Sequence, residues 1–303
     1  TLSDEENYTD KTILDYCAGD IHTADADPLV KLLQEKLGGG EFDFYTGTAY
    51  RHCMVWHGGK TALGKITPPH DITGKKIAEY LPSHPDAAPI LDLMKRSVDI
   101  LKDHPINRER VAKGLNPANA IWLWGQGNRP QLQNFHDRFG LHGSVVSAVD
   151  LLRGIGRLAG MNVCQVEGAT GYIDTNYTGK MQAALQELKN GQDYVYIHVE
   201  APDECGHRGE VQNKVKAIED IDRLILGPLL EQLPQFGDYT VMVLPDHPTP
   251  LDIRTHVSTP VPYLLYRSNA EQNSGIACFT EAAAETTGLL IDPGYTLIDR
   301  ALQ

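Results

Sequence analysis

Histidine and aspartate occur together at three places in the second half of the sequence, each beside a run of apolar residues. The first cluster contains Asp203 and His207, the second is Asp246-His247, and the third is His256. Carboxylate and neutral imidazole are ligands of divalent cations such as zinc and manganese. One Asp-His pair is more often a surface loop or a helix cap, but three clusters beside strands of one sheet indicate a metal site.

The number of candidate ligands indicates how many metal ions the site could hold. Five ligands are too many for one closed tetrahedral site and too few for two filled sites, so a pair of ions with open positions is expected. Such pairs stabilise the attacking and leaving oxygens in phosphoryl transfer. Cys205 could add a thiolate ligand, although a lone cysteine near Asp and His is more commonly incidental.

The elements that must position these residues differ between the two parts of the chain. From about residue 141, helices alternate with short apolar strands, which are expected at 161–166, 194–199, 239–244 and 261–266. This alternation predicts an α/β fold with a largely parallel sheet flanked by helices. In such folds, functional residues gather at the carboxyl ends of the strands.

The sequence before residue 141 is less regular. It predicts a helix that starts at Asp27-Pro28, a hairpin that turns at Gly58-Gly59, and a helix over 87–102. We therefore expect two domains, 1–140 and 141–303.

A few basic side chains occupy positions where an anion could be bound. These are Arg51 and His52 after a Gly-Thr turn, Arg129 in a glycine-rich loop, Arg153 in the helix expected from Ser147, and Lys180 at the end of a segment rich in small polar residues. Arginine forks suit phosphate and carboxylate. The alternatives are a solvated helix face for Arg153 and, for the segment before Lys180, an ordered connection that caps the next helix.

Composition excludes several classes of protein. The 303 residues carry 27 basic and 40 acidic side chains, a net charge of −13, which argues against nucleic acid or an anionic membrane as a partner. No apolar run approaches the roughly 20 residues that span a bilayer. The five cysteines are scattered without CxxC pairs, which favours a reducing, cytoplasmic setting.

Several motifs together resemble one family. They are the Ser147–Gly156 run, the Gly168–Lys180 segment, His198–His207, Pro245–Pro250 and the His256 segment, with Tyr50–His52, Pro68–Asp71 and Trp124–Gly127 in the earlier part. In this order they resemble the archaeal-type, cofactor-independent (2,3-bisphosphoglycerate-independent) phosphoglycerate mutases of the alkaline phosphatase superfamily. The resemblance covers nearly the whole chain.

The resemblance implies a fold, a reaction and a set of site residues. The fold would be an alkaline-phosphatase-like α/β core, here 141–303, with an inserted α+β substrate-handling domain, here 1–140. The reaction would interconvert 3-phosphoglycerate and 2-phosphoglycerate, a step of glycolysis and gluconeogenesis, through a phosphoserine. The cofactors would be two divalent ions, with manganese expected first and zinc, cobalt or magnesium as alternatives.

The implied residue roles follow the same motifs. One ion would be held by Asp203, His207 and His256, and the second by Asp246 and His247. The substrate's phosphate and carboxylate would be bound by Arg51, His52, Arg129, Arg153 and Lys180.

The sequence departs from the family in one respect. The family has a Gly-Asp-Gly-Met-type turn and, soon after it, a serine nucleophile in a Ser-Asp segment. Neither motif occurs in this chain, which begins at Thr1 without methionine, because Ser3-Asp4 lacks the context of the family's segment. We therefore expect a fragment of a longer enzyme, inactive when isolated. The alternatives are a metal-dependent phosphatase or mutase acting on another phosphorylated metabolite, and a non-catalytic, metal-stabilised interaction protein.

Overall fold

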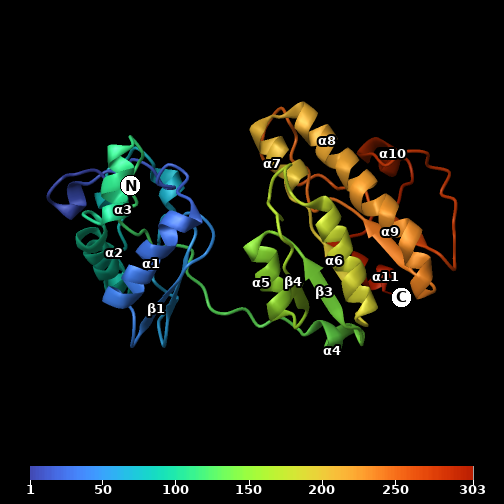
Figure 1. Cartoon of the computed structure of the whole chain (residues 1–303), viewed down its shortest axis with the longest axis horizontal. Helices are drawn as coiled ribbons and strands as arrows, with labels where there is room; N and C mark the ends of the chain where they lie inside the picture. Colours follow the sequence, from blue (N-terminus) through green and yellow to red (C-terminus); the bar gives the residue numbers. More distant parts are fainter. Residues whose placement is uncertain (303) are drawn as a thin grey trace. The chain divides into compact units, whose positions relative to one another are not determined.

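The computed structural model describes residues 1–302, which divide into two compact units (Figure 1). The first unit is Thr1–Arg129 and the second begins at Pro130. The boundary expected from the sequence, residue 140, lies inside the second unit, directly after the short helix α4 (Phe135–Phe139). Each unit has its own buried core and is described separately.

The first unit consists of helices packed on a two-stranded antiparallel hairpin. Its elements are η1 (Tyr8–Asp10), α1 (Thr23–Leu37), β1 (Phe42–Tyr45), β2 (Cys53–Trp56), η2 (Pro69–Ile72), η3 (Ala78–Tyr80), η4 (Pro85–Ala87), α2 (Ala88–Leu101) and α3 (Pro105–Ala112). The apolar stripe of α1, including Leu29 and Leu33, is buried with Phe44 of β1 and Leu93 of α2. Burial of these side chains holds the two helices to the hairpin.

Two local expectations for this unit are wrong. Helix α1 begins at Thr23 rather than Asp27, so Pro28 lies inside the helix, where its missing N–H cannot bond the carbonyl four residues earlier. The hairpin joins β1 to β2 and does not turn at Gly58-Gly59. Residues 62–66, which would form the second strand of a hairpin turning at Gly58-Gly59, form no strand, and Leu63 is buried in a core cluster.

The second unit contains a three-stranded parallel sheet and a two-stranded antiparallel one. The parallel sheet has the order β4 (Asn162–Cys164), β3 (Gly143–Val146) and β5 (Tyr194–Ile197), and the other pairs β6 (Thr240–Val243) with β7 (Leu264–Arg267). The helical elements after α4 are α5 (Asp150–Leu158), α6 (Tyr177–Lys189), α7 (Ala201–Arg208), α8 (Val211–Ile221), η5 (Asp222–Leu226), α9 (Gly227–Gln232), η6 (Leu233–Phe236), α10 (Glu281–Glu285), η7 (Gly294–Thr296) and α11 (Leu297–Ala301).

The α/β class with a parallel sheet is confirmed, although β3 at its centre was not expected and the strands expected at 239–244 and 261–266, β6 and β7, pair antiparallel in a separate sheet. Helix α5 packs on β3 and β4, and α6 packs on β3 and β5 (Figure 1). β6 and β7 run antiparallel because the segment between them is an irregular loop without a crossover helix, so the chain returns in the opposite direction. In residues 1–302 no helix has the length and apolar character needed to cross a bilayer.

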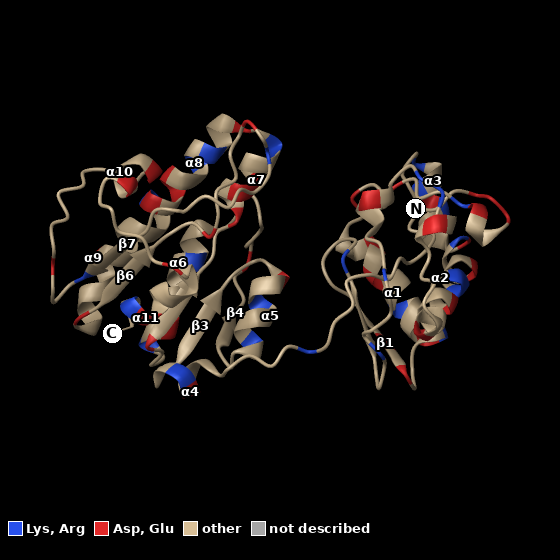
Figure 2. Cartoon of the chain, turned by 180° about the vertical axis from the view of Figure 1, so that it is seen from behind, with Lys and Arg blue, Asp and Glu red and all other residues tan. Residues whose placement is uncertain are grey.

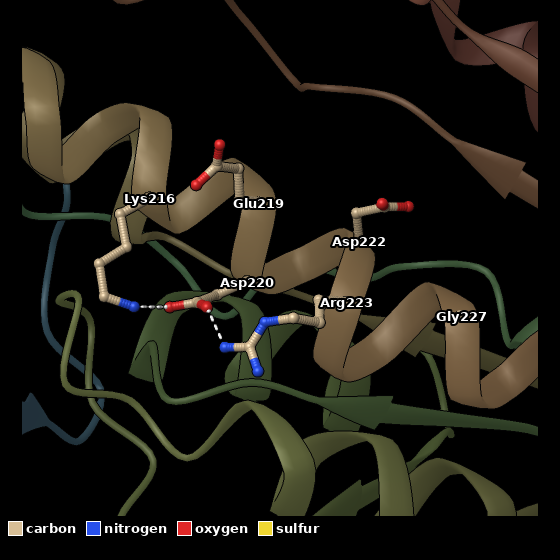
Figure 3. Close-up of a pocket in the computed structure, with 6 residues that line it drawn as sticks. All are labelled: Lys216, Glu219, Asp220, Asp222, Arg223 and Gly227. Carbon is tan, nitrogen blue, oxygen red and sulfur yellow. Dashed lines mark hydrogen bonds and ion pairs between the residues drawn. The ribbon is translucent and has the colours of Figure 1, made fainter.

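Charged residues of both signs lie along the helices of the second unit (Figure 2). The clearest group is at the junction of α8 with the π-helical turn η5, where the nearly buried carboxylate of Asp220 accepts hydrogen bonds from Lys216 and Arg223 (Figure 3). Both cations are neutralised inside this group, and Glu219 and Asp222 flank it. The group therefore stabilises the helix junction rather than forming a basic surface.

A buried lysine links α6 to the end of β5. Lys180 is 1% exposed, and its Nζ donates a hydrogen bond of 3.0 Å to the carbonyl oxygen of His198, the residue after β5. Burial lowers the pKa of Lys180 to about 8. The charged ammonium is therefore disfavoured by folding, although its hydrogen bond fixes the strand end.

The two glycines of α5 should respond oppositely to substitution by alanine. A Cβ on Gly156 would lie 2.8 Å from Cγ2 of Val145 in β3, whereas a Cβ on Gly154 would meet no atom within 4 Å. We expect Gly154→Ala to raise the free energy of unfolding by about 0.5–1 kcal/mol through helix propensity. Gly156→Ala should lower it by about 1–3 kcal/mol through overpacking. Urea denaturation measures both, and equal effects would contradict this packing.

The lowered pKa of Lys180 predicts a pH dependence of stability. Between about pH 8 and the ordinary value of 10.5, the unfolded lysine binds a proton that the folded one has released, so the free energy of unfolding rises with pH in this window. The rise should be on the order of 3 kcal/mol, and Lys180→Met should abolish it. The measurement is the difference in unfolding free energy between wild type and variant from pH 7.5 to 10.5. A constant difference would refute the assignment.

Candidate metal centre

Helix α7 presents two of the expected ligands one turn apart. The helix follows β5 closely, so its residues lie at the carboxyl end of a parallel strand. Asp203 and His207 share one helix face, with Oδ2 of Asp203 3.3 Å from Nε2 of His207. Gly209, with φ of +69°, ends the helix in the left-handed conformation.

The loop between β6 and β7 brings the other expected ligands to the same place. Nε2 of His256 lies 3.3 Å from Oδ1 of Asp203 and 3.0 Å from Nε2 of His207. The ring of His247 lies against that of His256, with 3.8 Å between centroids and 33° between the ring planes. Ligand atoms of Asp203, His247 and His256 all lie within 4.8 Å of one another. Segments distant in sequence thus converge on one carboxylate.

Asp246 lies at the edge of this cluster. Its largely exposed carboxylate is 3.3 Å from Nε2 of His247. The mutually close group of Asp203, His247 and His256 draws on both of the sets that the family resemblance implies for two separate ions.

The donor atoms fit a divalent cation. Nδ1 of His207 lies 3.0 Å from the carbonyl oxygen of Arg254, which can only accept, so this nitrogen carries the proton. The neutral ring then offers the lone pair of Nε2 toward Asp203 and His256. The carboxylate of Asp203 and the imidazoles of His247 and His256 form a donor set suited to zinc or manganese, and His207 adjoins it through Asp203 and His256.

A glycine allows the loop to come this close to α7. A Cβ on Gly206 would lie 2.6 Å from the carbonyl oxygen of Thr249 and 2.9 Å from Nζ of Lys214. Thr249 is buried, and its hydroxyl donates a hydrogen bond to Oδ1 of Asp203. Sequence reasoning missed Thr249, although its place between two prolines just after Asp246-His247 is a usable signal.

Two further polar residues lie at strand ends and were also missed. Ser147 follows β3 and His198 follows β5, and the serine Oγ is 3.2 Å from Nδ1 of the histidine. Burial lowers the pKa of His198, and Lys180 lowers it further. Each directly follows an apolar strand, which is the signal that could have identified them.

The expected anion-binding residues are divided between the two units. In the first unit, the guanidinium of Arg51 lies 4.6 Å from the centroid of the Tyr50 ring. There, Nδ1 of His52 accepts from the backbone N–H of Gly47 at 3.2 Å, and Arg129 is exposed.

In the second unit, Arg153 of α5 forms an ion pair of 3.2 Å with Asp150. Lys180 is buried against the His198 carbonyl, as described above.

Two sequence families match the chain. The Metalloenzyme superfamily matches residues 72–297, and the 2,3-bisphosphoglycerate-independent phosphoglycerate mutase family matches residues 1–107. A protein of Geobacter sulfurreducens named "Probable 2,3-bisphosphoglycerate-independent phosphoglycerate mutase" is 48% identical over 95% of this chain and 72% of its own length. The mutase of the same name from Methanosarcina barkeri is 46% identical over 91% of this chain and 70% of its own length.

Two solved structures are also similar to this chain. A cofactor-independent phosphoglycerate mutase from Thermoplasma acidophilum superimposes with a TM-score of 0.62 at 25% identity, over 96% of this chain and 72% of its own. The PH0037 protein from Pyrococcus horikoshii gives a TM-score of 0.71 at 25% identity, over 91% and 66%. The chain thus spans about two thirds to three quarters of the length of these proteins. It belongs to the 2,3-bisphosphoglycerate-independent phosphoglycerate mutase family of the metalloenzyme superfamily.

Proposed function

We propose that this chain provides the metal-binding core and substrate-binding residues of an enzyme that interconverts 3-phosphoglycerate and 2-phosphoglycerate. The family membership supports this activity, because the relatives are named as phosphoglycerate mutases. The observation that carries the proposal is the convergence of Asp203, His247 and His256 from α7 and the β6–β7 loop.

The proposed cofactors are two divalent cations, with manganese first and zinc, cobalt or magnesium as alternatives. The residues that would hold them are Asp203, His207, Asp246, His247 and His256. When bound, such ions supply positive charge that stabilises the transferring phosphoryl group and its attacking and leaving oxygens. The chain's own contribution is to hold the imidazole Nε2 atoms of His207 and His256 beside the carboxylate of Asp203 before a cation binds.

The arginines are proposed to bind the substrate's two anionic groups. Arg51, Arg129 and Arg153 provide planar forks that pair with phosphate or carboxylate in two-point hydrogen bonds, and His52 adds a further polar contact. The ion pair between Arg153 and Asp150 is partly solvent-exposed, so a substrate anion can replace the aspartate at small cost. For Lys180, the buried bond to the His198 carbonyl favours support of the strand end over direct contact with substrate.

We also propose a cytoplasmic location. All five cysteines are free, and two of them, Cys53 and Cys278, are exposed. Free exposed thiols are typical of proteins in reducing compartments.

Removing a proposed metal ligand should abolish tight binding of Mn²⁺. Loss of a residue that only hydrogen-bonds to a metal ligand typically weakens metal binding about 10–100-fold. We therefore expect Asp203→Asn and His256→Ala, which remove ligands themselves, to weaken Mn²⁺ binding by more than about 100-fold. Isothermal titration calorimetry of the 303-residue chain measures the affinity. His136→Ala is the matched control, since this exposed histidine stacks on His142 outside the cluster. Unchanged affinity in the ligand variants would exclude this centre.

Replacing an arginine fork should weaken substrate binding. For Arg153→Lys, we expect about 10-fold weaker binding of 3-phosphoglycerate by the Mn²⁺-loaded chain, because lysine keeps the charge but loses the fork. Binding is measured rather than turnover, since the family's serine motif has no counterpart in this sequence. Arg157→Lys, in the last turn of α5, is the control for Arg153→Lys.

The substrate class can be tested with the same binding assay. Competition by 4-nitrophenyl phosphate as effective as that by 3-phosphoglycerate would favour a general phosphatase and contradict the proposal.

A further inference from the structure

Thr249 is a buried polar residue in contact with two of the proposed ligands. Its side chain is almost inaccessible, at 4% exposure, in the irregular segment between Pro248 and Pro250. The hydroxyl donates a hydrogen bond to Oδ1 of Asp203, and the same oxygen lies 3.3 Å from Nδ1 of His247. One hydroxyl therefore joins a ligand of α7 to a ligand of the β6–β7 loop.

The direction of these two hydrogen bonds determines which ring nitrogen of His247 carries the proton. A threonine hydroxyl has one hydrogen, and the carboxylate of Asp203 can only accept. Because that hydrogen points to Asp203, the hydroxyl oxygen must accept from Nδ1–H of His247. A neutral His247 protonated at Nδ1 has its lone pair on Nε2, which is the form that binds a cation through Nε2.

The backbone of Thr249 is itself held in place from two sides. Nζ of Lys214, on α8, donates a hydrogen bond of 2.8 Å to the Thr249 carbonyl oxygen. The absence of a side chain at Gly206 lets that carbonyl lie against α7. The hydroxyl is thus fixed relative to Asp203 by the fold rather than by the metal.

We propose that Thr249 is a positioning residue that orients the Asp203 carboxylate and selects the metal-binding tautomer of His247 at the same time. This inference rests on the proposed metal-dependent function. Hydrogen bonds to ligating carboxylates and imidazoles fix their orientation, and their loss typically costs about 10–100-fold in metal affinity.

The test compares two substitutions of Thr249 with a control. Thr249→Val keeps the shape but removes both hydrogen bonds, and should weaken Mn²⁺ binding about 10–100-fold in calorimetric titrations of the full chain. Thr249→Ser keeps the hydroxyl and should bind close to wild type. Ser144→Ala removes another buried hydroxyl of the second unit, which donates to Glu187 at 2.5 Å, and should lower the melting temperature without weakening Mn²⁺ binding.

The outcomes separate this inference from the proposed function. If wild type binds Mn²⁺ and Thr249→Val binds equally well, or if Ser144→Ala weakens binding as much, the positioning role is refuted while the metal centre stands. Wild-type protein that binds no divalent cation refutes both.

A measurement on the wild-type protein avoids dependence on the folding of a variant. Nitrogen-15 shifts of the imidazoles, recorded with diamagnetic Zn²⁺ bound, distinguish the two tautomers. We expect His247 to be protonated at Nδ1. Protonation at Nε2 would overturn the proposal.

Discussion

The candidate metal centre depends on one close approach, that of the β6–β7 loop to helix α7 at Gly206. A Cβ at this position would overlap the Thr249 carbonyl, so only glycine allows the loop backbone to touch the helix. The approach brings the Thr249 hydroxyl to Asp203 and places His247 and His256 over the same carboxylate. Displacement of the loop by a fraction of an ångström would change whether Asp203, His247 and His256 can bind one cation, because metal–ligand distances tolerate only small deviations.

The parallel strands supply the frame on which this contact is built. β3 and β5 are hydrogen-bonded neighbours, so the residues that follow them, Ser147 and His198, meet at one edge of the sheet. The buried Lys180 binds the His198 carbonyl and so fixes the point from which α7 departs. A desolvated lysine is costly in its charged form, and burial accordingly lowers the pKa of Lys180 to about 8.

The local elements were predictable where one physical signal dominates. The apolar stripe of α2 and the alternation of helices with strands after residue 141 identified the helices and the α/β class. The β1–β2 hairpin was not found, because the strong turn signal of Gly58-Gly59 indicated a hairpin further along the chain, where Leu63 is instead buried in a core cluster outside any strand. Such competition between local and tertiary preferences is invisible in a short window of sequence.

The chemistry of the site follows from residue types and their spacing. The sequence contains the Asp and His clusters, places them beside apolar strands, and carries the motif set of the mutase family. Which of these side chains meet depends on how distant segments pack. Asp203, His247 and His256 form one group although the motifs divide them between two ions, and Lys180 is buried rather than exposed to an anion. The reason is physical: residue type sets what a side chain can bind, whereas packing of distant segments sets what it can reach.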